Sequence, residues 1–279
     1  MTSRIAALAT LLAALAACGS SPTPAPEVEA PAKASPEGMG LSMEDILGSA
    51  QSDTLVPSPM ETQRALESAE ITTRLSTLVP AHTEARSSDD KDHVAVRTGV
   101  VLADMMLTVK TSDKDTLLSR LSVIRESMAS LGGGRDIDLI LGTTRDQIRG
   151  DSVTRDKLVA DLDDLAGAVI PELEFNGQQR ILPLIQAGTW LEGANLVAKA
   201  VKAEGKPAAA DALLKQPAVV DYFIKYVRLE GAEHAPESVT QTLEASLTSL
   251  KAVASKSEPL TDEDVGLVIQ VTDNVLALL

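Results

Sequence analysis

Apolar residues recur every three or four positions over nearly all of residues 41–279. This spacing places them on one face of an α-helix, whereas a half-buried β-strand needs strict alternation. Capping boxes open two of the periodic stretches, at Ser58–Glu61 and Thr261–Asp264. No alternating stretch bounded by turn residues competes with the helical period. We therefore predict an all-α fold, a single multi-helix bundle of about nine or ten helices over residues 41–279.

Caps, prolines and glycines set the boundaries of the predicted helices. A helix that begins at Ser58 should continue to Val79, because Pro80 follows, and Gly132–Gly134 should end another. Pro171 falls inside one predicted helix and should kink it. The predicted helices are a short one from Ser42, then 58–79, 93–110, 112–131, 137–148, 154–175, 178–202, 217–230, 236–255 and 265–279.

The segment 178–202 is the most apolar of these helices, and its polar residues form one narrow stripe. Such a pattern is typical of a central helix that is surrounded by others. Gly99 with Ala103, and Gly188 with Gly193, offer small surfaces at which two apolar helices can pack closely. We expect Leu102, Gly188, Trp190 and Leu191 to lie in the core.

The charge of the chain excludes one class of partner. It has 40 acidic and 25 basic residues, a formal net charge of −15, and 2% aromatic residues. Binding to nucleic acid needs a basic stripe that neutralises phosphates, and often aromatic rings that stack on bases. We therefore expect no nucleic-acid partner. Anionic lipid headgroups would also repel this surface, so the helical domain itself should not adsorb to a membrane.

The first residues read as a secretion signal. Arg4 precedes the uncharged, mainly apolar stretch Ile5–Leu15, which is too short to span a bilayer. Leu15-Ala16-Ala17-Cys18 follows, and it resembles the lipobox of bacterial lipoproteins. The resemblance implies cleavage before Cys18 and acylation of its sulfur and its new amino group. The alternative is an ordinary signal peptide with a cysteine at the cleavage site by chance.

A lipid on Cys18 would anchor the chain to a membrane, because several acyl chains together bind a bilayer stably. Cys18 is the only cysteine, so after lipidation no disulfide, cysteine nucleophile or cysteine-bound zinc is available. Gly19 follows it; by resemblance to sorting in enteric bacteria, this residue permits export. We expect a cell-envelope protein, an outer-membrane lipoprotein that faces the periplasm or the surface.

Residues 18–40 join this anchor to the helical domain. The segment is rich in Pro, Ala and Ser and has almost no large apolar side chains, so it cannot bury enough surface to offset the entropy of ordering. We predict a disordered, extended tether. The expected organisation is a signal peptide at 1–17, the lipidated cysteine and tether at 18–40, and the all-helical domain at 41–279.

Motifs of catalysis are missing from the sequence. The three histidines, His82, His93 and His234, form no His-Glu-x-x-His pattern, and no Gly-x-Ser-x-Gly elbow or phosphate loop occurs. Asp90 precedes His93 by three residues, which a solvated helix cap explains better than a metal site. We predict no metal, no cofactor and no enzyme activity.

Two carboxyl groups stand out because they lie among apolar residues: Asp104, and Glu192 beside Trp190. A buried carboxyl group needs a partner or a raised pKa. The functional interpretation is a paired acid site, with Arg97 or Arg180 as possible partners. We favour a structural salt bridge or exposure on the polar stripe. If the two helices cross at their glycines, however, the carboxyl groups can meet, and one then stays protonated near neutral pH. That arrangement is the one that would revive an enzyme interpretation.

Two classes of function remain. The stretches Arg97–Asp104 and Gly188–Gly193 resemble parts of uncharacterised helical lipoproteins of environmental bacteria, a resemblance that implies no activity. We favour a non-enzymatic envelope lipoprotein that binds a protein partner or supports an envelope complex. The alternative is a carrier or sensor that holds a small apolar ligand between helices. The candidate binding residues are Asp104, Met105, Met106, Trp190 and Glu192, of which Trp190 and the methionines would line the pocket.

One observation separates the two classes. An enclosed apolar pocket of several hundred Å³ favours the ligand carrier. A solid core with an exposed apolar patch favours the protein-binding domain.

Overall fold

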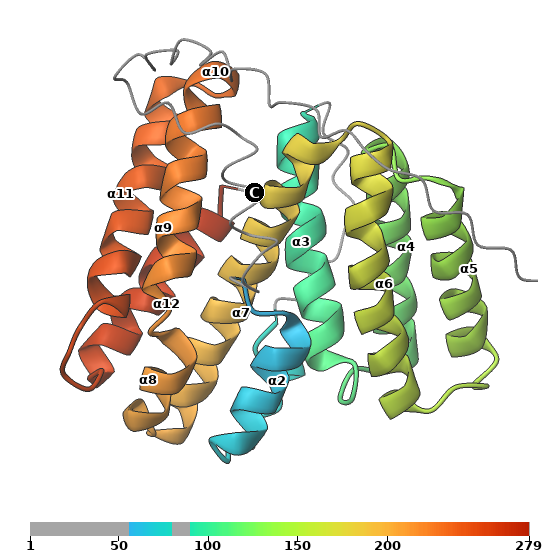
Figure 1. The fold of residues 1–279 in the computed structure, drawn as a ribbon. Coiled ribbons are helices and arrows are strands. Elements are labelled where there is room, and N and C mark those ends of the chain that lie inside the picture. The colour runs from blue at the N-terminus through green and yellow to red at the C-terminus, as the bar shows by residue number, and fades with distance from the viewer. Residues whose placement is uncertain (1–55, 80–89, 279) are drawn as a thin grey trace, which may run out of the picture. The chain divides into compact units, whose positions relative to one another are not determined.

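The computed structural model describes residues 56–79 and 90–278. Every regular element within these two ranges is a helix (Figure 1), so the predicted all-α fold is confirmed. Ten α-helices in the described ranges have eight or more residues. The signal peptide, Cys18, the tether, the helix predicted from Ser42 and His82 lie outside the described residues.

In chain order, the helices of the described residues are α2 (Pro59–Ser68), the 3₁₀-helix η1 (Leu75–Thr77), α3 (Lys91–Thr108), α4 (Lys114–Ser130), α5 (Arg135–Arg149), α6 (Arg155–Phe175), the 3₁₀-helix η2 (Gln179–Ile181), α7 (Leu182–Glu204), α8 (Pro207–Leu214), α9 (Pro217–Tyr226), the π-helix η3 (Val227–Gly231), α10 (Ala232–His234), α11 (Glu237–Ala254) and α12 (Asp262–Leu276).

The predicted helix starts agree with the structure where a side chain caps the backbone. Ser58 and Thr261 both form complete capping boxes. Asp113 accepts a hydrogen bond from the backbone N–H of Thr116 at 2.8 Å and caps α4. Thr154 caps α6, which runs through Pro171 to Phe175. These caps satisfy N–H groups that have no partner inside their helices.

The helix predicted over 58–79 is wrong in its second half, because α2 ends at Ser68. Glu70 has a φ of 54°, in the left-handed region, and turns the chain away from the helix axis. The backbone N–H groups of Thr72 and Thr73 then donate to Oε1 of Glu204, at 2.5 and 2.6 Å. The carboxylate of Glu204 thus accepts hydrogen bonds from two backbone N–H groups that would otherwise have donated within a longer helix.

Two further differences lie in the C-terminal half. Helix α8 was not predicted, because eight residues are too few to establish a helical period. The helix predicted over 217–230 is α-helical only as far as Tyr226, and it continues as the π-helix η3. The wider turns of a π-helix are rare in proteins and occur often at functional sites.

Helices α3 and α7 make the most extensive contact in the described fold. One hydrophobic cluster fills the space between α3, α4, α5 and α6, and a second joins α7 to α2, α8, α9, α11 and α12. In Figure 1, α3 to α6 lie on one side of α7, and α8, α9, α11 and α12 lie on the other. Helix α7 is therefore central, as predicted, and the α3–α7 contact connects the two clusters.

Candidate functional site

The backbones of α3 and α7 touch at two glycines. A Cβ atom on Gly99 would lie 2.0 Å from the carbonyl oxygen of Ile185, and one on Gly188 would lie 1.9 Å from that of Val96. Thr189 adds a hydrogen bond from its Oγ1 to the carbonyl oxygen of Gly99 at 3.2 Å. Close packing at these two glycines is confirmed. Gly193 differs, because a Cβ there meets nothing within 4 Å.

Three contacts show that α3 and α7 run parallel. Asp92 pairs with Arg180 before the crossing, Gly99 and Gly188 meet at it, and Asp104 meets Glu192 about one turn beyond it. The contacts follow the same order along both helices. Arg180, which was a possible partner for the buried acids, is instead bound by Asp92, with 2.8 Å between Nη1 and Oδ2.

The carboxyl groups of Asp104 and Glu192 share a hydrogen bond. Both residues are buried, with exposed fractions of 7% and 4%. Burial raises the pKa of Asp104 to about 6, against the hydrogen bond from Glu192 and the positive charges of Arg120 and Lys199. Burial, together with the negative charge of Asp104, raises the pKa of Glu192 well above its ordinary value. Near neutral pH, Glu192 therefore keeps its proton, and its carboxyl O–H donates a hydrogen bond to the carboxylate of Asp104.

Arg120 of α4 supplies the nearby positive charge, and sequence reasoning missed it. Its side chain is 3% exposed, and Nη1 donates to the carbonyl oxygen of Asp104 at 3.2 Å and to the hydroxyl groups of Thr108 and Ser112. Burial lowers its pKa, whereas the charge of Asp104 raises it. Its position between Leu117 and Leu121, on the apolar face of α4, could have indicated from the sequence that Arg120 is buried.

The polar cluster of Asp104, Glu192 and Arg120 holds one shared proton, one negative charge and one positive charge. Within the described fold, Oδ1 of Asp104 and Nε of Arg120 have no hydrogen-bond partner. The arrangement is a paired acid site, and neither the direct salt bridge nor the exposed position that we favoured describes it. Neither carboxyl group lines the two cavities described next.

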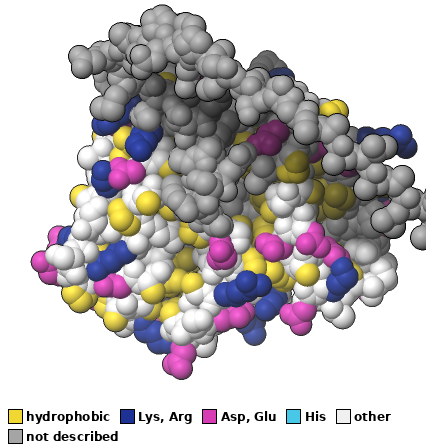
Figure 2. All heavy atoms as spheres, viewed as in Figure 1, with side chains coloured by type: hydrophobic (Ala, Val, Ile, Leu, Met, Phe, Trp, Pro, Cys, Tyr) yellow, Lys and Arg dark blue, Asp and Glu magenta, His cyan; other side chains and the backbone are white. Residues whose placement is uncertain are grey.

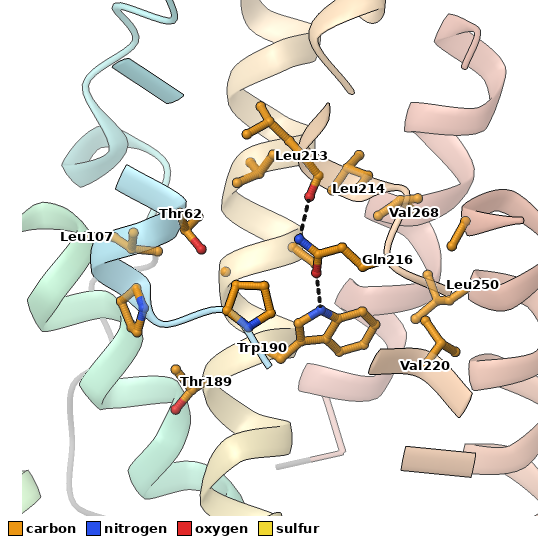
Figure 3. Close-up of a pocket in the computed structure, with 16 residues that line it drawn as sticks. Thr62, Leu107, Thr189, Trp190, Leu213, Leu214, Gln216, Val220, Leu250 and Val268 are labelled. Carbon is orange, nitrogen blue, oxygen red and sulfur yellow. Dashed lines mark hydrogen bonds between the residues drawn. The ribbon is translucent and has the colours of Figure 1, made fainter. Parts of the chain in front are cut away.

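Trp190 is a core residue with a satisfied indole group (Figure 3). Its Nε1 donates to Oε1 of Gln216 at 2.9 Å, and Nε2 of Gln216 donates to the carbonyl oxygen of Leu213 at 3.1 Å. Its ring lies 5.5 Å from that of Phe223, centroid to centroid. The cavity beside it measures only about 30 Å³, roughly the volume of one water molecule.

The residues predicted to line a ligand pocket are not brought together. Met105 and Met106 belong to the cluster of α3 to α6, and Trp190 belongs to the cluster of α7 to α12. All three are buried. The structure therefore places these side chains in two separate parts of the core.

A much larger cavity, of about 360 Å³, lies between α7, α9 and α11, and we call it the α9–α11 groove. Helix α7 contributes one wall, α9 and η3 a second, and α11 with the end of α12 a third. Its apolar lining consists of Val96, Leu184, Ala187, Leu191, Phe223, Val227, Ala235, Pro236, Val239, Leu243, Leu247, Leu250, Val275 and Leu278.

One end of the α9–α11 groove is polar. Arg180 and its partner Asp92 line it, and Tyr226 donates from its hydroxyl group to the carbonyl oxygen of Arg180 at 2.9 Å. Glu230 and His234 form a pair there with 3.4 Å between Oε2 and Nε2. The hydrogen bond from Arg180 to Asp92 raises the pKa of the guanidinium group, which stays charged. The groove thus joins an apolar channel to a charged end.

The π-helix η3 belongs to this groove. Its residues Val227, Glu230 and Gly231 all line the cavity. A Cβ on Gly231 would lie 2.7 Å from Cγ2 of Thr240, so η3 packs tightly against α11. No local sequence pattern marks Glu230 and His234 as groove residues, because the groove forms only where η3 packs against α11 and residues of α3 complete the lining.

Three further observations concern metal ions, membranes and related proteins. Among the described residues, no three or more His, Cys, Asp or Glu side chains are grouped to hold a metal ion. No helix in residues 56–79 and 90–278 has the length and apolar character to cross a membrane. The chain matches none of the protein-family models, curated proteins or solved structures with which it was compared.

Proposed function

We propose that this chain is a non-enzymatic cell-envelope lipoprotein whose helical domain holds a small apolar ligand in the α9–α11 groove. The observation that carries the proposal is the apolar cavity of about 360 Å³. Sites for small molecules span about 300–1,000 Å³ and have mainly apolar walls with a few polar groups. The ligand carrier was the alternative interpretation of the sequence. The groove has the volume and the apolar walls that this interpretation requires, although it is partly open to solvent and not enclosed.

Burial of an alkyl chain supplies the binding energy in this proposal. Each methylene group removed from water contributes about 0.8 kcal/mol, so a chain of several carbons offsets much of the entropy lost on binding. The position of the two acids with raised pKa values, outside the walls of the groove, supports binding as the role of the groove.

The anchor is part of the same proposal. The resemblance of Leu15–Cys18 to a lipobox supports a lipid on Cys18, and Gly19 supports export to the outer membrane. The segment 18–40 would then hold the binding domain away from the bilayer.

A second candidate function is binding of a protein partner, and one observation favours it. Phe175 at the end of α6 is 88% exposed, and Leu139 of α5 is 66% exposed. Exposed aromatic side chains often anchor protein interfaces. The two functions are compatible, because these residues do not line the groove.

Binding of a neutral apolar fluorophore, N-phenyl-1-naphthylamine, tests the proposed function. We expect saturable binding with one site per chain. Ser246→Phe places a ring in the groove and should abolish it, because Ser246 lines the cavity. Thr248→Phe on the exposed face of α11 is the matched control and should bind as the wild type does. A wild-type chain without saturable binding, or full affinity in Ser246→Phe, would contradict the proposal.

A further inference from the structure

The charged end of the α9–α11 groove points to one class of ligand. We propose that the groove binds a single-chain amphiphile with a cationic headgroup, whose alkyl chain lies along the apolar walls and whose headgroup lies beside Glu230. This inference rests on the proposed function and names the ligand class for the same groove.

The balance of charge at this end is negative. The lining includes three carboxylates, Asp90, Asp92 and Glu230, against the guanidinium group of Arg180 and the imidazoles of His93 and His234. Asp92 accepts two hydrogen bonds from Arg180, so these two charges compensate each other. Asp90 caps α3 and accepts from the backbone N–H of Asp92 at 2.9 Å. Glu230 pairs with His234, which adds a positive charge only when it is protonated. When His234 is neutral, the carboxylate of Glu230 sets the sign of charge that a bound headgroup meets.

An anionic headgroup fits this end poorly. The guanidinium group of Arg180 is already engaged with Asp92, and the chain as a whole carries a net charge of −15. That field attracts cations and repels anions over long range. On the face shown in Figure 2, acidic and basic side chains are interspersed among hydrophobic ones.

Aromatic rings strengthen the case for a cation. Phe223 and Tyr226 both line the groove, and Tyr226 reaches the charged end, where its hydroxyl group donates to the carbonyl oxygen of Arg180. The faces of aromatic rings attract ammonium groups. Carboxylate and ring together suit a primary or quaternary ammonium headgroup, and η3 places apolar Val227 and acidic Glu230 on one continuous wall.

Competition against bound N-phenyl-1-naphthylamine tests this inference. The competitors are decyltrimethylammonium, decanoate and decanol, each below the concentration at which it forms micelles. We expect the cation to displace the fluorophore at a concentration about tenfold lower than decanoate does, and this preference to shrink at high salt. Tetramethylammonium, which lacks the chain, should not displace it.

Two matched variants assign the preference to the charged end. Glu230→Gln should weaken the binding of decyltrimethylammonium about tenfold and leave the binding of decanol unchanged. Glu233→Gln also removes one negative charge, but Glu233 is exposed and does not line the groove. This variant should change the binding of neither decyltrimethylammonium nor decanol. Equal binding of decanoate and the cation, or no effect of Glu230→Gln, would overturn the cationic class while the proposed function stands. Absence of fluorophore binding would instead overturn the proposed function.

Discussion

Asp104 and Glu192 share a proton between two parallel helices, about one turn beyond the point where Gly99 and Gly188 bring the backbones into contact. The two features depend on each other. The glycine crossing brings the two backbones together, so the carboxyl groups one turn further on can meet in the core. Arg120 then balances the one negative charge that remains.

Stability should fall as the pH rises through the range in which this pair loses its protons. Both pKa values are raised above their ordinary values of 3.8 and 4.5, so the folded chain holds protons that the unfolded chain releases. The stabilisation is fully present below about pH 4 and is lost as the pH rises through about 6 for Asp104. For Asp104 alone this is on the order of 3 kcal/mol, at about 1.4 kcal/mol per pH unit.

Urea unfolding at pH 5, 6, 7 and 8 measures the effect. Lys256 lowers the pKa of Asp264 to about 2, so this group makes stability rise with pH, opposite to the acid pair. The stabilisation from Asp264 is lost only as the pH falls below about 4. Above pH 5 the acid pair should dominate among the shifted carboxyl groups. An unfolding midpoint that stays constant or rises from pH 5 to pH 8 would argue against the shared proton.

Glu192→Gln should remove the part of this pH dependence that comes from Glu192 and leave the part that comes from burial of Asp104. An amide has the shape of the protonated acid, and its NH₂ group can still donate to Asp104. The variant should match the wild type at pH 5 and exceed its free energy of unfolding by about 1–3 kcal/mol at pH 8. Glu233→Gln, at an exposed position, is the control and should keep the slope. A variant that is less stable than the wild type at pH 8 would contradict the prediction.

The predictions from sequence succeeded where the physical cause is local. Ser58 and Thr261 cap helices whose first turns they precede directly, and Gly99 and Gly188 lie in helices that are apolar enough to be buried. The end of α2 could not be predicted, because the partner of Thr72 and Thr73 is Glu204, far along the chain.

The site was predictable only in part for the same reason. The acid pair was foreseen on the condition that the helices cross at glycines. Its neighbour Arg120 comes from α4, and no spacing within α3 or α7 indicates it. The α9–α11 groove depends on a π-helix whose residues Val227 and Glu230 have an ordinary helical pattern in the sequence.

Gly99→Ala and Gly188→Ala should each destabilise the fold by several kcal/mol. The new Cβ would meet a backbone carbonyl oxygen at 2.0 or 1.9 Å, which can be relieved only if α3 and α7 move apart. Gly193→Ala in the same helix is the control, because nothing lies within 4 Å of its Cβ. It should be neutral or more stable by about 0.5–1 kcal/mol. Equal thermal midpoints for all three variants would contradict the crossing.

Trp190→Ala should cost about 3–5 kcal/mol, since it removes a large buried side chain and leaves Gln216 without its indole partner. Trp190→Phe keeps the contact with Phe223 and should cost less. Chemical unfolding followed by circular dichroism gives both values. An unchanged midpoint in Trp190→Ala would show that this side chain does not support the core.

Cys18→Ser should release the chain from the membrane. The resemblance to a lipobox makes Cys18 the acylated residue, and no other cysteine can replace it. Several acyl chains hold a protein on a bilayer stably, whereas the acidic domain has no electrostatic attraction to anionic lipids. The wild type should therefore sediment with membranes, and its mass should show a cleaved, acylated N-terminus at Cys18. The variant should accumulate as the uncleaved, unacylated precursor. An unmodified Cys18 in the wild-type protein would remove the basis for the anchor and for the proposed localisation.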